Sequence, residues 1–485
     1  MIKKFTILLL IVLIHSCGQD ELSDPIDEKS SESNLLKIEL EHNETTYTTS
    51  INGLTVTLQK TLPYGAEEVS IKTIEISDKA TSSKKQGDLL QVGESPISID
   101  ISAESGTFQK EYTINLTTEI ANSFTTNDHS ILLNQAPLDI KGVVYTPNYP
   151  GNLPWDIERS VLSTAYENSI LNDVSNIKEM GANTIRLWDP PVYTYQAIKE
   201  TGGLFLLQTI WINTEESNFQ STAFKDGTKA YIKKIIDRIY SVYRDNNPPI
   251  IAYIVGNELS GLSIISTNDA NPDITSYSGN YISATNVNAT EAFIAEMADY
   301  VKTYEFETYK NSSLVTYANY IGTYDLIDVP FLDFRCDNAY SYAPPYYRPE
   351  TALGSNSGTV FQGWVEQVKS KHPNMPLLIS ETGLSVSPDA DRLGPPDYGY
   401  GGNSEKEQAD GILQNFNDLN TAALPTAGVC IHEYLDSWWK SGQADDQLTD
   451  QPEEWFGLVK FTREGDWYIT EPREAYTRIK SFWEQ

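Results

Sequence analysis

Cysteine is scarce in this sequence, with three residues in 485, and only Cys336 and Cys430 lie beyond the first 17 positions. Two cysteines cannot build a disulfide framework or a cysteine-ligated metal site. Each lies in an apolar run that is typical of a buried strand, so we expect both thiols to be unpaired. Nothing in the sequence implies a metal ion or a cofactor.

Basic residues are also few. The chain carries 35 Lys and Arg against 67 Asp and Glu, a formal net charge of -32. Such a charge repels phosphate backbones and anionic lipid headgroups, which argues against nucleic acid as a partner. A neutral polysaccharide meets no such penalty, and the 29 Tyr and 9 Trp include side chains that can stack on sugar rings. Most of these aromatic residues should nevertheless fill a core.

A short apolar run at residues 5–14 follows Lys3 and Lys4 and precedes Cys17. It is too short for a membrane span. The segment resembles a bacterial lipoprotein signal peptide, which implies cleavage before Cys17 and a lipid on that cysteine; an ordinary secretory signal is the alternative. The acidic stretch after Cys17 is similar to those that direct lipoproteins of some Gram-negative bacteria to the cell surface. We therefore expect a lipid-anchored protein of the outer membrane or cell surface, although a periplasm-facing anchor is also open.

Three changes of pattern divide the rest of the chain. Residues 18–34 are polar and aperiodic and predict a flexible tether after the signal segment 1–17. Residues 35–118 contain short alternating runs separated by turn residues, which predict a small β-sandwich of the immunoglobulin-like kind. It contains no cluster of titratable groups, so a spacer is favoured over a carbohydrate-binding module. Residues 122–485 form the third part.

In residues 122–485, apolar strands alternate with helical patterns, which predicts an α/β fold. Helical patterns fall between most of the expected strands, for instance at residues 160–180, 228–244, 291–304, 359–371 and 404–419, with residues 473–483 closing the chain. Eight strands interleaved with helices match a (β/α)8 TIM barrel. An open doubly wound sheet usually has a glycine-rich turn after its first strand, and none follows here. The expected strands are residues 140–145, 184–188, 204–211, 250–255, 314–318, 331–340, 377–381 and 428–432.

Two glutamates end expected strands. Glu258 follows Asn257 at the end of the fourth, and Glu381 ends the seventh. Active sites of such barrels lie at the C-terminal ends of the strands. Cleavage of a glycosidic bond with retention requires one carboxylic acid and one carboxylate about 5–5.5 Å apart. The pair therefore predicts a glycosidase site.

The segments Val255-Gly256-Asn257-Glu258 and Ile379-Ser380-Glu381-Thr382-Gly383 resemble those of clan A, a large clan of retaining glycoside hydrolases with (β/α)8 barrels. The resemblance extends from about residue 130 to the C-terminus. It implies that Glu258 is the general acid/base and Glu381 the nucleophile. The hairpin and first strand at residues 130–143 look like the barrel entry of members related to β-galactosidases and glucuronidases, which implies that this hairpin closes the barrel floor.

The same resemblance implies accessory residues that bind the substrate. Arg186, near the end of the second strand, matches the clan's arginine beside the nucleophile, and a guanidinium favours an ionised carboxylate. Tyr340, after the sixth strand, matches a side chain that contacts the nucleophile. Asn257 would bond the sugar 2-hydroxyl. Each could instead only pack or cap its strand.

The eighth strand departs from the usual clan pattern, in which a tryptophan forms the floor of the sugar subsite. Here the segment is His432-Glu433-Tyr434-Leu435-Asp436-Ser437-Trp438-Trp439-Lys440, similar to a Glu-Trp-x-Asp-x-Trp-Trp-Lys segment of some bacterial members. Tyr434 or Trp438 is expected as the floor. Glu433 and Asp436 either bind outer hydroxyls or are solvated.

The resulting expectation is a retaining β-glycoside hydrolase that works by double displacement on an oligo- or polysaccharide, as a monomer. Long segments at residues 260–289 and 385–403 are expected to shape its cleft. Families acting on β-1,3-glucan, including transglycosylating ones, look most similar, while β-mannan, β-galactan and other β-glucans stay open. The alternatives are a β-glucan transglycosylase and a non-catalytic carbohydrate-binding protein of the cell surface.

Overall fold

The computed structural model describes residues 29–154, 163–244, 247–341, 359–389, 398–423, 425–465 and 467–484. The signal segment, Cys17 and most of the tether lie outside these residues. The chain divides into two compact units, with the boundary between Ile120 and Ala121. Among the described residues, no helix is both long and apolar enough to cross a membrane.

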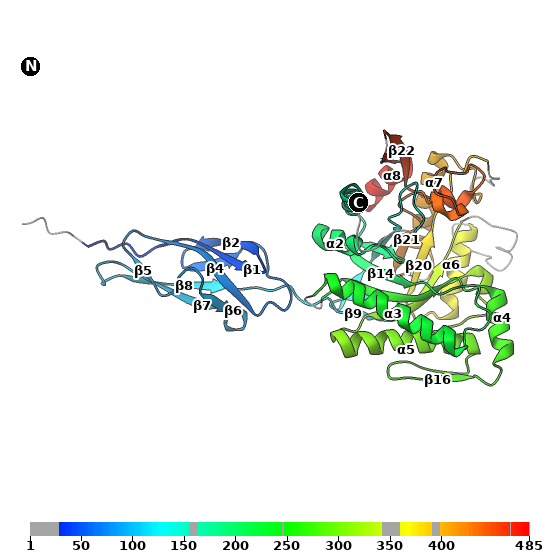
Figure 1. Ribbon diagram of the computed structural model, residues 1–485, viewed down its shortest axis with the longest axis horizontal. Coiled ribbons are helices and arrows are strands. Elements are labelled where there is room, and N and C mark those ends of the chain that lie inside the picture. Colours follow the sequence, from blue (N-terminus) through cyan, green and yellow to red (C-terminus); the bar gives the residue numbers. More distant parts are fainter. Residues whose placement is uncertain are drawn as a thin grey trace, which may run out of the picture. The chain divides into compact units, whose positions relative to one another are not determined.

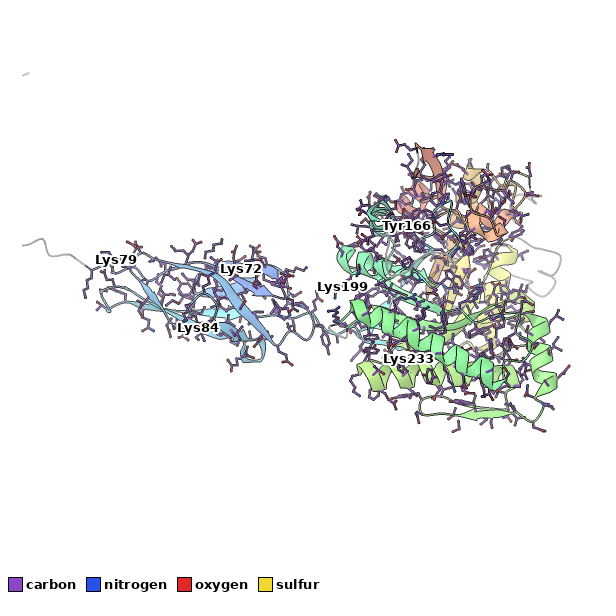
Figure 2. All side chains as sticks on the ribbon, viewed as in Figure 1. Lys72, Lys79, Lys84, Tyr166, Lys199 and Lys233 are labelled. Carbon is purple, nitrogen blue, oxygen red and sulfur yellow. The ribbon has the colours of Figure 1, made fainter. Side chains whose placement is uncertain are left out.

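The N-terminal unit is a β-sandwich. Its eight strands join in the order β5-β7-β8-β3-β2-β1-β4-β6, and alternate residues along them are buried. Side chains from both halves of this order, such as Leu40 and Ile71 from one and Ile99 and Ile114 from the other, share a single core. Lys72, Lys79 and Lys84 project outward from the strands and their connections (Figure 2). The strands are β1 (Leu35–His42), β2 (Thr45–Asn52), β3 (Thr55–Leu58), β4 (Glu68–Ile76), β5 (Thr81–Ser82), β6 (Leu89–Gln91), β7 (Ile97–Ser102) and β8 (Gln109–Asn115).

The C-terminal unit is a closed barrel of eight parallel strands, so the expected α/β barrel fold after a sandwich is confirmed (Figure 1). The first strand pairs with the last, Ile140 opposite Gly428, which closes the barrel. Each strand is almost wholly buried, as expected where helices cover the outside. The strands are β12 (Ile140–Val144), β13 (Thr184–Leu187), β14 (Phe205–Ile210), β15 (Ile250–Asn257), β18 (Leu314–Tyr320), β19 (Arg335–Asn338), β20 (Leu377–Thr382) and β21 (Gly428–Ile431).

Helices cover the barrel, and polar caps begin several of them. Asn288 with Glu291, and Ser404 with Glu407, form capping boxes at two N-termini. Lys199 and Lys233 lie on the exposed faces of the second and third helices (Figure 2). The helices are α1 (Thr164–Glu179), α2 (Val192–Thr201), α3 (Thr222–Val242), α4 (Gly261–Ala270), α5 (Ala289–Tyr309), α6 (Val360–Lys371), α7 (Glu405–Thr421) and α8 (Glu474–Trp483). α2 and α4 were not among the helices named from the sequence pattern.

A small three-stranded sheet, β9 (Phe124–Thr126), β10 (Ile131–Leu133) and β11 (Ala136–Leu138), precedes the barrel. Phe124 and Ile131 share a core with residues inside the barrel, and Phe124 meets Phe205, the first residue of β14, edge-on at 5.5 Å. The sheet therefore covers the end of the barrel at which the strands begin. Two further hairpins are β16 (Ser276–Ser278) with β17 (Ser283–Thr285), and β22 (Val459–Glu464) with β23 (Trp467–Pro472).

Cys336 on β19 and Cys430 on β21 belong to the core inside the barrel, and both are unpaired and buried. Burial raises the pKa of each thiol to about 12. They are therefore packing residues and not reactive thiols.

Candidate active site

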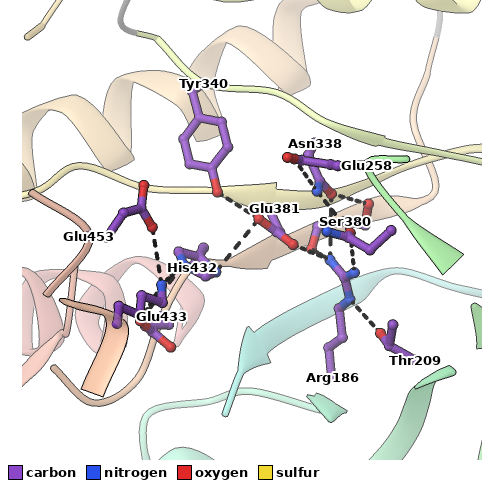
Figure 3. Close-up of polar contacts among 12 residues, drawn as sticks. Arg186, Thr209, Glu258, Asn338, Tyr340, Ser380, Glu381, His432, Glu433 and Glu453 are labelled. Carbon is purple, nitrogen blue, oxygen red and sulfur yellow. Dashed lines mark hydrogen bonds and ion pairs between the residues drawn. The ribbon is translucent and has the colours of Figure 1, made fainter. Parts of the chain in front are cut away.

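The two glutamates at the ends of β15 and β20 line the same cavity, which has a volume of about 660 Å³. Glu258 follows the last residue of β15, and Glu381 is the last residue but one of β20. Figure 3 shows the two side chains near one another, with Arg186 bonded to Glu381 and Asn338 bonded to Glu258. The two residues thus lie together, as their positions at strand ends predict.

Arg186 on β13 is fully buried and connects the nucleophile candidate to its neighbours. Its Nη1 donates to Glu381 Oε1 at 2.8 Å and to the Ser380 carbonyl at 2.9 Å. Its Nη2 donates to Asn257 Oδ1 at 2.8 Å, and its Nε to Thr209 Oγ1 at 3.1 Å. A planar guanidinium can make these bonds in several directions at once, so Arg186 fixes residues from three other strands.

Glu381 accepts hydrogen bonds at both carboxyl oxygens and is only 5% exposed. Oε1 accepts from Arg186, while Oε2 accepts from the Tyr340 hydroxyl at 2.7 Å. The Nδ1 atom of His432 lies 3.7 Å from Oε2. These contacts hold the carboxyl group in one orientation, as an attacking group requires.

Glu258 lies in a different environment. Its side chain is half-buried, and Asn338 Nδ2 donates a hydrogen bond to its Oε1 at 2.7 Å. Burial, and then the negative charge of Glu381, raise the pKa of Glu258 to about 8, although the Asn338 bond opposes the rise. A carboxyl group with this pKa keeps its proton at neutral pH and can give it to a leaving oxygen.

The backbone around Glu258 is unusual. Gly256 has a φ of 91°, and a Cβ there would lie 3.3 Å from both Ile212 and Tyr317 side chains. Glu258 itself has a positive φ of 46°, and its N–H donates to the Ala318 carbonyl at 3.0 Å. Left-handed backbone costs energy in a residue with a side chain, so the neighbouring strand β18 must hold it. The result is a glutamate turned away from the strand direction at the barrel mouth.

Asn338, the last residue of β19, was missed by the sequence reasoning although it lies beside Tyr340. Its Nδ2 donates to Glu258 and also to Asn257 Oδ1 at 3.0 Å, while its Oδ1 accepts from Ser380 Oγ at 2.7 Å. It is therefore the side chain that links the surroundings of the two glutamates. Its position at a strand end was the signal that could have found it.

Aromatic side chains form much of the rest of the cavity wall. Trp188 meets Trp211 edge-on at 5.6 Å, and the Arg186 guanidinium lies 4.6 Å from the Trp188 ring. Trp211 is 49% exposed, so it offers a free indole face beside the glutamates. Such surfaces suit the apolar faces of sugar rings. The aromatic lining residues are Tyr145, Trp188, Trp211, Tyr231, Tyr320, Tyr340, Tyr400 and Trp439.

The expected floor residues are placed differently. Tyr434 is 1% exposed, packs edge-on against Tyr145 at 5.7 Å and does not line the cavity. Its backbone N–H donates to the Val144 carbonyl of β12, which holds the residue within the wall. Trp438 packs edge-on against Phe461 and Tyr468 outside the cavity. The next residue, Trp439, takes the lining position.

The two extra carboxylates of this segment also separate. Asp436 is buried and accepts hydrogen bonds from Nη1 and Nη2 of Arg473, at 2.6 and 2.7 Å, so it is structural and not solvated. Glu433 lines the cavity. Of the two segments expected to shape the cleft, 260–289 contributes no lining residue, because it forms α4 and the β16–β17 hairpin. Segment 385–403 contributes Tyr400 among its described residues.

No metal site is found in the part of the chain that the structure describes, since no three His, Cys, Asp or Glu side chains there gather to hold an ion. The chemistry available at the site is that of one carboxyl group with a raised pKa and a second carboxyl group bonded to a guanidinium, both facing one cavity.

Comparisons with known proteins place the fold but not a family. No family model matches the sequence, and no curated protein matches it. Among solved structures, β-glucuronidase from Ruminococcus gnavus is 15% identical, with a TM-score of 0.51, over 93% of this chain and 68% of that one. A β-glucuronidase from an uncultured Clostridium species is 14% identical, with the same TM-score and the same coverage.

A β-glucuronidase from Bacteroides uniformis is 13% identical, with a TM-score of 0.50, over 94% of this chain but 49% of that one. At these identities the similarity establishes the shared architecture alone.

Proposed function

We propose that this protein is a retaining β-glycoside hydrolase that acts on an oligo- or polysaccharide. The observation that carries the proposal is the contrast between two glutamates in one cavity: Glu381 is bonded to a buried guanidinium, whereas the pKa of Glu258 is raised to about 8. One carboxyl group held as an acceptor and one held protonated are the two parts that glycoside hydrolysis needs. The barrel shared with β-glucuronidases supports the same class.

The reaction proceeds in two displacements. The Glu381 carboxylate attacks the anomeric carbon, and the bond from that carbon to the leaving oxygen breaks as Glu258 gives its proton to the oxygen. The ionised Glu258 then takes a proton from water. The water oxygen attacks the same carbon and releases Glu381, so the configuration is retained and Glu258 is protonated again.

Three further side chains support the transition state. Tyr340 and Arg186 hold Glu381 while its charge is transferred to the sugar, and Asn257, which lines the cavity, would bond the 2-hydroxyl. The Trp188 and Trp211 pair offers a stacking surface for a sugar of a longer chain. A β-1,3-glucan is the substrate that the motif resemblance favours, with transglycosylation on β-glucan as the second activity.

The proposed location follows from the N-terminal segment. A lipid on Cys17 would hold the protein at the outer membrane or cell surface of a Gram-negative bacterium, where a polysaccharide is accessible.

The test separates the roles of the two glutamates. Glu381→Gly should abolish hydrolysis and regain part of it with azide, giving a glycosyl azide of inverted configuration. Glu258→Ala should lose activity on natural glycosides but keep reacting with substrates whose leaving group needs no proton. A protein that bound polysaccharide while neither wild type nor variants cleaved any glycoside would instead be a surface binding protein.

A further inference from the structure

A cluster of charged side chains occupies the side of the cavity formed after β21. We call Lys440, His432, Glu433 and Glu453 the Lys440 cluster, and all four line the cavity. Lys440 Nζ lies 2.9 Å from His432 Nε2, 3.0 Å from Glu433 Oε1 and 3.2 Å from Glu453 Oε2. Figure 3 shows Glu433, His432 and Glu453 on the opposite side of Glu381 from Glu258.

The ammonium group of Lys440 has no donor left for an anionic ligand. It carries three N–H bonds, and three acceptors surround it. Burial disfavours its charge, but the charges of Glu433 and Glu453 outweigh burial and raise the pKa of Lys440. Burial, with Lys440 and Arg186 nearby, lowers the pKa of His432 far below its usual value, so the imidazole is neutral. The cluster thus places one cation against two carboxyl groups.

The rest of the lining formed by described residues offers no cation in compensation. Among the described residues, Lys440 is the one Lys or Arg that lines it. Arg186 lies behind the wall and is fully buried, with its Nη1 on Glu381. Asp189, also in the lining, is ion-paired with Arg238. Carboxyl groups therefore outnumber cations in the described lining of the cavity.

We propose that the Lys440 cluster makes this a site for a neutral glycone and excludes uronic acids, an inference that rests on the proposed glycosidase function. A uronate carboxylate would lose its water and meet Glu433 or Glu453, while the three N–H bonds of the Lys440 ammonium are already taken by His432, Glu433 and Glu453. A neutral sugar hydroxyl both donates and accepts, so it can bond the outer oxygens of these carboxylates. The barrel is shared with β-glucuronidases, but the charge pattern selects the opposite class of glycone.

The first test compares two lactones that differ in charge. D-glucaro-1,5-lactone, which occurs in a complex with the R. gnavus β-glucuronidase, carries a carboxylate where freshly dissolved D-glucono-1,5-lactone carries a hydroxymethyl group. Titration calorimetry on the full chain should show at least tenfold tighter binding of the neutral lactone. Tighter binding of the glucarolactone, or binding of neither, would overturn the proposal.

The second test removes one negative charge from the cluster. Glu453 is 45% exposed at its side chain, so Glu453→Gln should fold normally. It should shift the ratio of the two affinities at least threefold toward the glucarolactone, because Lys440 then faces one carboxyl group and not two. Glu464→Gln, an exposed change of the same size on β22, should leave the ratio unchanged. A ratio that moves equally in both variants, or in neither, would contradict the role of the cluster.

Hydrolysis assays distinguish failure of the neutral-glycone inference from failure of the proposed glycosidase function. Efficient cleavage of 4-nitrophenyl β-D-glucuronide would overturn the neutral-glycone inference and leave the glycosidase proposal intact. Selective binding of the neutral lactone without cleavage of any glycoside would refute the glycosidase proposal and leave the binding preference standing.

Discussion

The raised pKa of Glu258 gives a prediction that can be measured through the pH dependence of catalysis. Because a general acid must be protonated, kcat/KM on a glycoside with a poor leaving group should fall as the pH rises through about 8. The Asn338 hydrogen bond stabilises the ionised form and so holds this pKa lower than burial alone would. Removing the bond should therefore move the basic limb of the profile to higher pH.

The size of the effect follows from the strength of the bond. A hydrogen bond to a charged group contributes about 1.5 to 3 kcal/mol, and about 1.4 kcal/mol corresponds to one pH unit. Asn338→Ala should thus move the basic limb from about 8 to about 9 or above, together with a fall in kcat/KM as the bond to Asn257 is lost. The assay is kcat/KM against pH from 5 to 10, in buffers of constant ionic strength.

Ser380→Ala is the matched control, because it removes the Ser380 bond to Asn338 but leaves the bond to Glu258 in place. Its basic limb should stay near that of the wild type. An aryl substrate whose leaving group needs no proton should show no basic limb near pH 8. A limb that stays at the wild-type position in Asn338→Ala, or moves to lower pH, would refute the assignment of Glu258 as the acid.

Two further predictions concern stability and location. Arg473→Met leaves the buried Asp436 carboxylate without its cationic partner and should lower the free energy of unfolding by about 3 to 5 kcal/mol. Arg478→Met, which removes the cation of the more exposed pair with Asp410, should lower it by about 1 kcal/mol or less. Urea titrations measure both changes. Cys17→Ser should abolish labelling by a fatty-acid probe and release the protein from membranes; labelling that persists would place an anchor elsewhere.

The sequence predicted the parts of the site that the barrel backbone itself positions. Glu258, Glu381 and Arg186 lie at or near strand ends, where parallel strands bring their side chains to one face whatever the loops do. Asn338 obeys the same rule at the end of β19 and could have been included on the same ground.

The segment after β21 could not be read in the same way, because contacts distant in the sequence determine its course. Tyr434 bonds β12, Asp436 bonds Arg473, and Lys440 lies between Glu433 and Glu453. The periodicity of apolar residues does not predict such pairings in an irregular segment. Tyr434 and Trp438, the two residues expected at the floor, consequently lie outside the cavity lining while Trp439 is part of it, and the Lys440 cluster was missed.

The N-terminal sandwich leads to the last prediction, which concerns its role. Its core is self-contained, and every catalytic candidate lies in the barrel unit, which begins at Ala121. A shortened chain that starts at Asn122 keeps β9 to β11, whose apolar side chains cover the barrel end. Loss of these strands would expose the apolar surface of the barrel end to water. If the sandwich is a spacer, this chain should match the full chain in turnover of soluble oligosaccharides and in binding to insoluble glucan. A marked loss of pull-down on insoluble glucan with unchanged soluble turnover would make residues 35–118 a binding module.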